Sequence, residues 1–412
     1  MGASVAGSSA QLLERLASII GPENVRAAGS AIIAAPADTQ QIAEILRFAH
    51  TNELTVVPTG GGTKRSWGNP VTPDILLSLE RMHRLREHTW EDMTCTVEAG
   101  CTWAAMQAEL RRHGQMVALD PLWPEMATIG GIVATNDSGG LRLKYGGLRD
   151  LIIGMTVVLP DGTIAKSGGK VVKNVAGYDL HKLMTGSFGT LGLIAEVNFR
   201  LHPVESSVLS YTVSAADASF FAAPVHALLE SEVTPSCVQF RIGDGVCSLD
   251  LHIASRPECM DEYDRRVRSI FSEMTVSTAG DDVWRAREAL FADKNAVVLK
   301  ISVLPADVCS LCAELQRGSS AQNLISCVAQ TTGLITVALR VAPDAAVAAI
   351  ESLRTRVQSS HGSAVVLQLP DALRGSIDVW GAQPAALPLM REIKRQFDPH
   401  RILNPDRFVG NI

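Results

Sequence analysis

A run of three glycines follows an apolar, strand-like segment early in the chain. The segment extends from Val56 to Gly68 with the sequence VVPTGGGTKRSWG, and Gly60, Gly61 and Gly62 lie at its centre. Consecutive glycines let backbone N–H groups turn inward and approach an anion closely, which forms a cradle for phosphate oxygens. The loop therefore indicates phosphate binding, and a plain glycine-rich surface loop is the open alternative for this segment alone.

The loop fits neither of two common nucleotide-binding patterns. A P-loop lysine follows glycine directly and is itself followed by Ser or Thr. Lys64 instead has Thr63 before it and Arg65 after it. The spacing also departs from G-x-G-x-x-G, because Arg65 occupies the place of the third glycine. A dinucleotide fold of the Rossmann type is therefore disfavoured.

Two further glycine clusters follow at wide spacing. The second covers residues 127–140 with the sequence ATIGGIVATNDSGG, which adds hydroxyl and amide side chains that can donate and accept hydrogen bonds. The third covers residues 177–194, where glycines recur at three-residue spacing before an apolar strand pattern. Each cluster alone is a weak signal, but several such loops suit a large polyphosphate ligand.

Alternating helix and strand patterns position these loops in the first half of the chain. Asp38 and Gln41 have the spacing of a capping box before an amphipathic helix, and the β-branched run Thr55–Val57 leads into the first glycine loop. The runs Met155–Leu159 and Thr163–Ala165 flank an Asp-Gly pair and predict a hairpin. This half is therefore expected to be α/β.

Glycine density falls beyond residue 205, where we place a domain boundary. The runs Val238–Ile242 and Ser248–Ile253 predict strands, and Val347–Val357 predicts a helix. This second half is expected to be an antiparallel sheet that carries helices.

Composition and charge exclude several classes of protein. The 412 residues are 46% hydrophobic and 19% charged, with a net charge of −6, which is typical of a globular chain of about two domains. The charges are scattered without a basic stripe, so a nucleic-acid partner is not expected. The apolar runs are shorter than a membrane-spanning helix requires, and no secretory signal is recognised, so a cytoplasmic location is expected.

Cysteine usage points to reduced thiols, because eight cysteines are spread along the chain. Cys309 and Cys312 form a C-x-x-C that could be half of a redox or metal site. They also share a helical apolar face with Val308, Leu311 and Leu315, and no second pair supplies the four thiolates of a zinc or iron–sulfur site. We favour the helix-core interpretation and predict no metal.

Four segments together resemble the FAD-binding domain of the vanillyl-alcohol oxidase and p-cresol methylhydroxylase family, from about residue 30 to 205. They are VVPTGGGTKRSWG, DPLWPEMATIGGIVATNDSGG, YGGLRDLIIGMTVVLPDG and GGKVVKNVAGYDLHKLMTGSFGTLGLIAEV. A further segment, residues 397–408 with the sequence FDPHRILNPDRF, is similar to the C-terminal tail of the FAD-linked oxidases. Within the family, the phrase KNVAGYDLHKLMTGSFGTLG and the modest length are most similar to the FAD-binding E subunits of bacterial glycolate oxidases.

The resemblance implies an α+β fold in which two α/β subdomains form a p-cresol methylhydroxylase-type FAD-binding domain over residues 1–205. A C-terminal α+β cap domain with an antiparallel sheet is expected over residues 206–412, and its tail, residues 397–408, is expected to return to the FAD domain. FAD is expected between the two subdomains.

The resemblance also implies which residues hold FAD. In the first loop they are Pro58, Thr59, Gly60, Gly61, Gly62, Thr63, Lys64, Ser66 and Trp67. In the second and third they are Thr128, Gly130, Gly131, Thr135, Asn136 and Ser138, with backbone from Gly189 to Ile194. Lys64 and Arg65 are suitable for charge balance, and a solvated basic pair at a loop edge is their alternative. Some members attach flavin through a histidine near the first loop, but no histidine lies between Thr51 and Met82, so FAD is expected to be noncovalent.

The second half departs from the family enzymes that oxidise 2-hydroxy acids. Those enzymes commonly carry H-x-G-D-G-N-x-H, whose histidines accept a proton and bind metal or substrate. Here the nearest sequence is RIGDGVCS, with Arg241, Val246 and Ser248 in place of His, Asn and His. We interpret its Gly243–Gly245 as a hairpin turn and assign no catalytic base.

Three functional hypotheses remain. The first is an FAD-binding subunit of a glycolate oxidase (glycolate dehydrogenase) complex, with a sister flavoprotein subunit and an iron–sulfur subunit as partners and glycolate converted to glyoxylate. Membrane association is expected only through those partners, at the inner face. The second is a free-standing FAD-dependent oxidoreductase for another 2-hydroxy acid or alcohol, for which Arg241, His252 and Lys173 are the first candidates to bind substrate or transfer a proton. The third is a binding or assembly protein in which flavin is structural.

Overall fold

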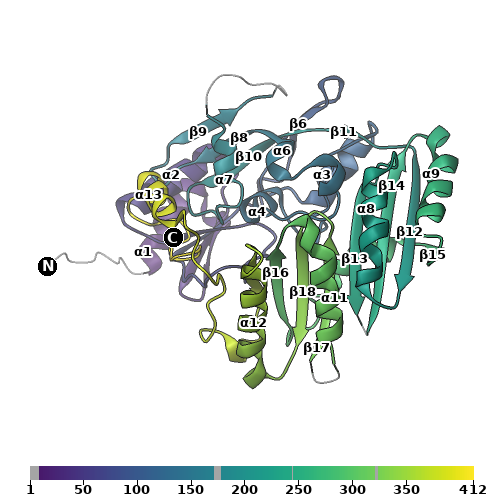
Figure 1. Ribbon diagram of the computed structural model, residues 1–412. Coiled ribbons are helices and arrows are strands. Elements are labelled where there is room, and N and C mark those ends of the chain that lie inside the picture. Colours follow the sequence, from purple (N-terminus) through teal and green to yellow (C-terminus); the bar gives the residue numbers. More distant parts are fainter. Residues whose placement is uncertain (1–8, 171–177, 244, 321–322) are drawn as a thin grey trace. The chain divides into compact units, whose positions relative to one another are not determined.

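A computed structural model describes residues 9–170, 178–243, 245–320 and 323–412 of the chain (Figure 1). These residues form two compact units. Unit 1 comprises the described parts of Met1–Asp137, Gly147–Pro203 and Gln383–Ile412, and unit 2 comprises those of Ser138–Gly146 and Val204–Ala382. Division into domains at residue 205 stays a prediction, and the compact units differ from it in two segments. Residues 138–146 belong to unit 2, and residues 383–412 belong to unit 1.

The first sheet of unit 1 has the strand order β1-β2-β4-β3, with β4 parallel to both β2 and β3. Its strands are β1 (Val25–Ala28), β2 (Ala31–Ala34), β3 (Val56–Thr59) and β4 (Ile75–Ser78), and the helices before β3 are α1 (Ser9–Ile20) and α2 (Thr39–Thr51). The side chain of Asp38 accepts a hydrogen bond of 2.9 Å from the backbone N–H of Gln41, so the predicted start of α2 is confirmed.

The second sheet of unit 1 is antiparallel, with the order β5-β6-β10-β8-β9. Its strands are β5 (Leu85–Thr89), β6 (Thr94–Glu98), β8 (Ile152–Val158), β9 (Ile164–Gly168) and β10 (Leu193–Arg200), and β7 (Gln115–Met116) pairs with β11 (His202–Pro203). The remaining helices of unit 1 are α3 (Trp103–Arg111), α4 (Ile129–Thr135), α6 (Leu148–Leu151), α7 (Leu180–Met184) and α13 (Leu387–Phe397). The predicted hairpin is formed by β8 and β9.

One apolar core joins both sheets of unit 1. It contains Ile75 and Leu77 from the first sheet, Val97 and Phe199 from the second, and Leu403 from the segment after α13. Leu403 also forms a parallel bridge with Val56, so this segment extends the first sheet beside β3. From here on, we use the word tail for residues 398–412, which include all but the first residue of the segment 397–408 predicted to return to the FAD domain. It lies beside the strand that carries the first glycine loop.

Unit 2 is an eight-stranded antiparallel sheet with the order β15-β12-β14-β13-β17-β18-β16-β19. Its strands are β12 (Ser207–Ala215), β13 (Cys237–Gly243), β14 (Val246–Ser255), β15 (Thr275–Thr278), β16 (Val297–Ser302), β17 (Leu324–Gln330), β18 (Leu334–Arg340) and β19 (Ser363–Gln368). Its helices are α5 (Arg142–Tyr145), α8 (Ala222–Glu230), α9 (Pro257–Ile270), α10 (Ala286–Ala289), α11 (Val308–Gly318) and α12 (Pro343–Gln358). The predicted antiparallel sheet with helices is confirmed (Figure 1).

Short 3-10 helices occur in both units. In unit 1 they are η1 (Pro22–Asn24) and η2 (Trp90–Asp92), and in unit 2 they are η3 (Ala218–Phe221), η4 (Asp281–Arg285), η5 (Pro305–Asp307) and η6 (Asp371–Leu373).

Helix α11 contains the C-x-x-C, and its buried side chains include Val308, Leu311, Cys312 and Leu315, as the helix-core interpretation predicts. The pKa of Cys312 is raised by the hydrogen bond between its thiol and that of the neighbouring Cys327, and by burial. Within the described ranges, no group of three or more His, Cys, Asp or Glu side chains is arranged to hold a metal ion.

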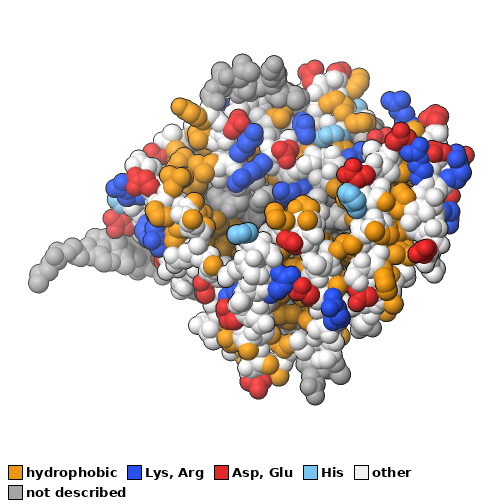
Figure 2. All heavy atoms as spheres, viewed as in Figure 1, with side chains coloured by type: hydrophobic (Ala, Val, Ile, Leu, Met, Phe, Trp, Pro, Cys, Tyr) orange, Lys and Arg blue, Asp and Glu red, His pale blue; other side chains and the backbone are white. Residues whose placement is uncertain are grey.

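Gly243 of β13 pairs with Val246 of β14, so the GDG sequence lies at a hairpin, with Asp244 itself outside the described residues. Among the helices that the structure describes, none is both long enough and apolar enough to cross a lipid bilayer. On the face shown in Figure 2, basic and acidic side chains of the described residues are interspersed.

Candidate functional site

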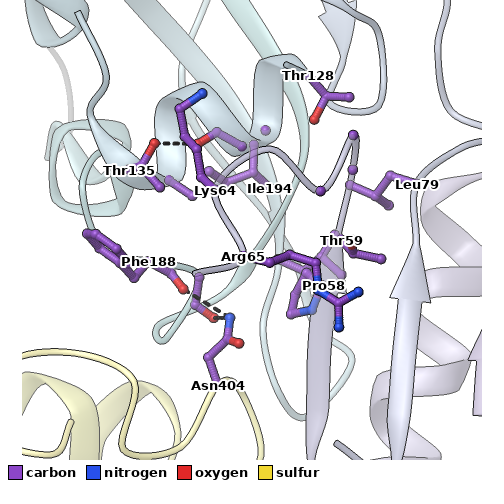
Figure 3. A pocket seen from close by; sticks show the side chains of 18 of the residues that line it. Pro58, Thr59, Lys64, Arg65, Leu79, Thr128, Thr135, Phe188, Ile194 and Asn404 are labelled. Atoms are coloured by element: carbon purple, nitrogen blue, oxygen red, sulfur yellow. Dashed lines mark hydrogen bonds between the residues drawn. The ribbon is translucent and has the colours of Figure 1, made fainter. Parts of the chain in front are cut away.

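A solvent-open pocket of about 760 Å³ lies within unit 1, where all three glycine segments and the tail meet (Figure 3). The lining residues are Pro58 to Arg65, Leu79, Thr128, Gly130, Gly131, Ala134, Thr135, Phe188, Gly189, Gly192 to Ile194, Asn404 and Arg407. None of these described lining residues is Asp or Glu, so the pocket suits an anionic ligand.

The first glycine loop leaves β3 and borders the pocket with its backbone. No residue in the described parts of the chain accepts a hydrogen bond from the backbone N–H of Gly60, Gly61, Gly62 or Thr63. A buried or pocket-facing N–H group needs an acceptor, and phosphate oxygens are suitable ones. The loop therefore offers a row of donors to a ligand in the pocket.

Gly60 and Gly61 are required by the close approach of the second segment. A Cβ atom on Gly60 would lie 2.0 Å from Oγ1 of Thr128, and one on Gly61 would lie 1.8 Å from the carbonyl oxygen of Met126. Both distances are too short for non-bonded atoms. Any side chain here would push the two walls of the pocket apart, which is a different reason for glycine from the phosphate approach that the sequence suggested.

The second segment forms helix α4, with Thr128 at its N-cap position. A Cβ atom on Gly131 would meet only the Oγ1 of Thr128, at an ordinary contact distance of 3.5 Å, so this glycine borders open pocket space. The hydroxyl of Thr135 donates to the carbonyl of Gly131 at 2.7 Å (Figure 3). Its oxygen can still accept a hydrogen bond from a ligand.

Lys64 departs from the expectation that it balances ligand charge. Its Nζ atom lies 3.3 Å from Oδ2 of Asp137, and both side chains are buried. The same Nζ lies 5.6 Å from the ring centroid of Trp67 and 5.4 Å from that of Trp123, within the range of cation–π attraction. Figure 3 shows the side chains of Lys64 and Arg65 pointing in opposite directions. Lys64 therefore holds the loop to the protein.

Of the residues named individually for the first and second segments, all but four line the pocket, and so do Gly189 and Gly192 to Ile194 of the third. Ser66 is exposed, and Trp67 is buried. Asn136 ends α4 with φ of +48°, a conformation that asparagine tolerates better than most residues. Ser138 belongs to unit 2, where its carbonyl accepts a hydrogen bond of 2.6 Å from Arg287. The positions of these four residues give no support to a cofactor role.

Sequence reasoning omitted several lining residues, chiefly Leu79, Phe188, Asn404 and Arg407. Asn404 donates from Nδ2 to the carbonyl of Phe188 at 2.9 Å, as Figure 3 shows. The only signal for the two tail residues was the likeness of FDPHRILNPDRF to FAD-linked oxidases, which did not identify individual side chains.

Of the three residues considered for substrate chemistry, Arg241 and His252 lie in the second half of the chain and Lys173 in the first. Arg241 donates from Nε to Oδ2 of the fully buried Asp250 at 2.5 Å and from Nη2 to Oδ1 at 3.0 Å, and this pairing raises its pKa. The pKa of His252 is lowered by burial and by the positive charge of Lys144, so its imidazole is neutral near pH 7. Lys173 lies outside the described residues.

Comparison with known protein families indicates which cofactor the chain binds. Residues 30–168 match the family described as an FAD binding domain, and residues 380–408 match the C-terminal domain of FAD linked oxidases. The first match contains two of the glycine segments, and the second contains most of the tail. The loop N–H groups without an acceptor in the described residues, and the absence of carboxylates among the described lining residues, both fit the polyphosphate of FAD. FAD is therefore the cofactor of unit 1.

Several curated proteins are similar in sequence. Glycolate oxidase subunit GlcD of Bacillus subtilis is 34% identical over 50% of this chain and 44% of its own length. A D-2-hydroxyglutarate dehydrogenase of Xanthomonas citri is 27% identical over 91% of this chain and 88% of its own length. The match to the Bacillus protein thus spans less than half of that relative.

Solved structures share the fold. p-Cresol methylhydroxylase superposes with a TM-score of 0.77 at 15% identity, covering 98% of this chain and 97% of that chain. At this identity the likeness concerns the fold alone. The predicted p-cresol methylhydroxylase-type arrangement is confirmed.

Proposed function

Because the chain belongs to the FAD-linked oxidases, a family of FAD-dependent oxidoreductases, we propose that it is the FAD-binding subunit of a glycolate oxidase complex. The observation that carries this proposal is the pocket of unit 1, in which three glycine segments and the tail converge on one anion-binding space. The similarity to a glycolate oxidase subunit supports glycolate as the substrate of the complex and glyoxylate as its product.

The residues of unit 1 bind and orient the cofactor. FAD, when bound, supplies the acceptor for the two electrons removed from a hydroxyl-bearing carbon. The N–H groups of Gly60 to Thr63 would donate to its polyphosphate, and α4 with Gly131 and Thr135 would form the second wall of its site. The ion pair of Lys64 and Asp137 keeps the first loop in place against that wall.

Electrons leave through partner subunits in this proposal. The eight cysteines are free thiols, and the described residues contain no cluster of ligands for a metal centre. An iron–sulfur subunit would therefore receive the electrons, and a sister flavoprotein subunit would hold the substrate. We place the complex in the cytoplasm, with contact to the inner face of the membrane only through partners.

A free-standing FAD-dependent oxidoreductase for a 2-hydroxy acid or an alcohol is the second candidate. Two observations favour it: the similarity to a D-2-hydroxyglutarate dehydrogenase along most of both chains, and a neutral, partly buried His252 that could accept a proton. Imidazole near its neutral form is suited to general-base catalysis.

Anaerobic dye reduction separates the two candidates. The chain loaded with FAD is mixed with glycolate, D-lactate or D-2-hydroxyglutarate, first alone and then with the proteins that co-purify with the tagged chain. We expect turnover only with the partners, because general-base assistance is worth about 10²–10⁴ in rate and the chain lacks the paired-histidine sequence. The complex should contain more than one flavin. Rapid turnover by the lone chain, abolished in His252→Gln, would instead establish the free-standing enzyme.

A further inference from the structure

The sheet of unit 2 carries polar side chains on the face opposite its apolar core. Successive side chains of a strand point to opposite faces, and the residues that flank Thr212, Gln239, Arg241 and Asp250 in their strands belong mostly to the core. The register pairs Asp250 of β14 with Thr212 of β12 on one side and with Gln239 of β13 on the other. We call these four residues the polar face, and Asp250 lies at its centre.

Both oxygens of Asp250 are fully used in hydrogen bonds. Oδ1 accepts from Oγ1 of Thr212 at 2.8 Å and from Nη2 of Arg241 at 3.0 Å. Oδ2 accepts from Nε of Arg241 at 2.5 Å and from Nε2 of Gln239 at 3.2 Å. A carboxylate has about four lone-pair sites, so these four bonds satisfy it. They hold the carboxylate in place beside the guanidinium.

Arg241 binds this carboxylate in the way in which arginine binds the carboxylate of a ligand. Two of its nitrogens donate to the two oxygens of Asp250, which is the bidentate geometry. The side chain of Arg241 is 30% exposed and that of Asp250 is fully buried, so a ligand could reach only the arginine. The carboxylate of Asp282 adds a second negative charge near Arg241. A ligand carboxylate that displaced Asp250 would leave a buried charge unpaired, which is strongly unfavourable.

We propose that Asp250 determines the charge selectivity of the polar face, because it occupies Arg241 in place of a substrate carboxylate. The pair is electrically neutral and offers no net attraction to an anion such as glycolate. The inference rests on the proposed function for its choice of ligand, and it explains why glycolate is left to the sister subunit. For the free-standing candidate, the same pairing favours an uncharged alcohol over a 2-hydroxy acid.

Calorimetry on the FAD-loaded chain tests this role with glycolate and glycolamide, two probes of nearly the same shape that differ in charge. Asp250→Asn and Asp250→Ser remove the carboxylate and leave no charge fully buried, because Arg241 is partly exposed. Asp250→Asn/Arg241→Gln removes the cation as well. Asp264→Asn is the matched control, since Asp264 of helix α9 also accepts from an arginine, Arg268, at 3.0 Å and lies outside the polar face. Thermal unfolding of each protein gives Tm and identifies the variants that fold.

The wild-type chain should not bind glycolate more tightly than glycolamide. Asp250→Asn and Asp250→Ser should bind glycolate about 10-fold or more tightly than the wild type does, because the freed guanidinium can pair with the ligand carboxylate. Their affinity for glycolamide should stay unchanged. The double variant should lose the gain, and Asp264→Asn should never show it.

Two results would overturn the proposal. A wild-type preference for glycolate that disappears in the double variant would show that Arg241 binds a ligand carboxylate despite Asp250. Folded Asp250 variants without a gain for glycolate would show that Asp250 does not set the selectivity. Neither result depends on turnover or on partner subunits, so the proposed function fails separately, if the complete complex does not oxidise glycolate.

Discussion

Two glycines of the pocket, Gly131 and Gly61, differ in what surrounds them. Gly131 borders open space, so Gly131→Val should fold normally but fill part of the volume in which we propose that FAD binds. Gly61→Val should collide with the backbone of Met126 and lower the free energy of unfolding of the apoprotein by about 1–3 kcal/mol. Flavin content after purification and urea unfolding of the apoproteins measure the two effects.

Gly114→Ala is a suitable control for these variants. Gly114 has positive φ, follows helix α3, does not line the pocket, and has no atom within 4 Å of the position of its Cβ. It should lose a little stability through backbone strain but keep its flavin. A Gly131→Val protein that retains a full complement of FAD would show that the cofactor lies elsewhere.

The flavin is predicted to be noncovalent. No histidine lies between Thr51 and Met82, and none of the described residues that line the pocket is histidine or cysteine. Acid precipitation of the purified protein should therefore leave the yellow colour in the supernatant. A yellow pellet, with flavin attached to a peptide after digestion, would contradict the prediction.

Residue types alone identified the glycines of the pocket but not the direction of its charged side chains. Successive glycines after a β-branched run restrict the backbone locally, so the first loop could be located from the sequence. The orientation of Lys64 depends on Asp137 and Trp123, which are distant in the sequence, and no local pattern contains that information.

At the scale of elements, α13 and the tail are anchored by a buried ion pair. Lys394 donates from Nζ to Oδ2 of Asp398 at 2.6 Å and to the carbonyls of Thr190 and Leu403 at 2.8 and 3.0 Å. The pKa of Lys394 is lowered by burial, which the attraction of Asp398 opposes. This pair holds the tail against the third glycine segment.

Lys394→Met should lower the free energy of unfolding by about 3–5 kcal/mol, because it leaves the carboxylate of Asp398 buried without its cation. Urea denaturation of the apoprotein measures the loss. The double variant Lys394→Met/Asp398→Asn should lose less, since no charge is left buried. Equal losses in the single and double variants would mean that packing, rather than the ion pair, supports the tail.

Helix ends and hairpins that depend on neighbouring residues could be predicted from the sequence. The strand beside which the tail lies could not. The α2 cap and the β8–β9 hairpin each depend on residues within about one turn or one strand length of each other. The bridge between Val56 and Leu403 joins segments that no periodicity can connect. The expectation that residues 397–408 return to the FAD domain came from family resemblance alone.

At the scale of the whole molecule, stability should depend on pH through one histidine in each unit, the buried His181 and the partly buried His252. Burial lowers the pKa of His181 in unit 1 and of His252 in unit 2 below the ordinary value of 6.5. The unfolded chain then binds more protons than the folded one in the window just below pH 6.5. The stability that the folded protein gains from these neutral histidines is therefore complete above pH 6.5. It is lost as the pH falls through the lowered pKa values of the two histidines in the folded protein.

Urea unfolding between pH 7.5 and about pH 5 should show this loss. His252→Gln should reduce the slope for unit 2 and leave that for unit 1 unchanged, because the two histidines lie in different units. A stability that rises as the pH falls over this window would show that the folded protein prefers charged imidazoles at these positions.

The discontinuity of unit 1 has a consequence for biosynthesis. Residues 204–382 separate its earlier segments from Gln383–Ile412, and a ribosome needs roughly 10–40 s to translate that interval. The glycine loops thus leave the ribosome well before the helix and tail that complete their core. A nascent chain in this interval lacks Asn404 and Arg407, which line the pocket, so we expect flavin to be loaded only after unit 2 has been translated. Chains cut before residue 404 would remain colourless, and yellow colour would report on the integrity of the polypeptide.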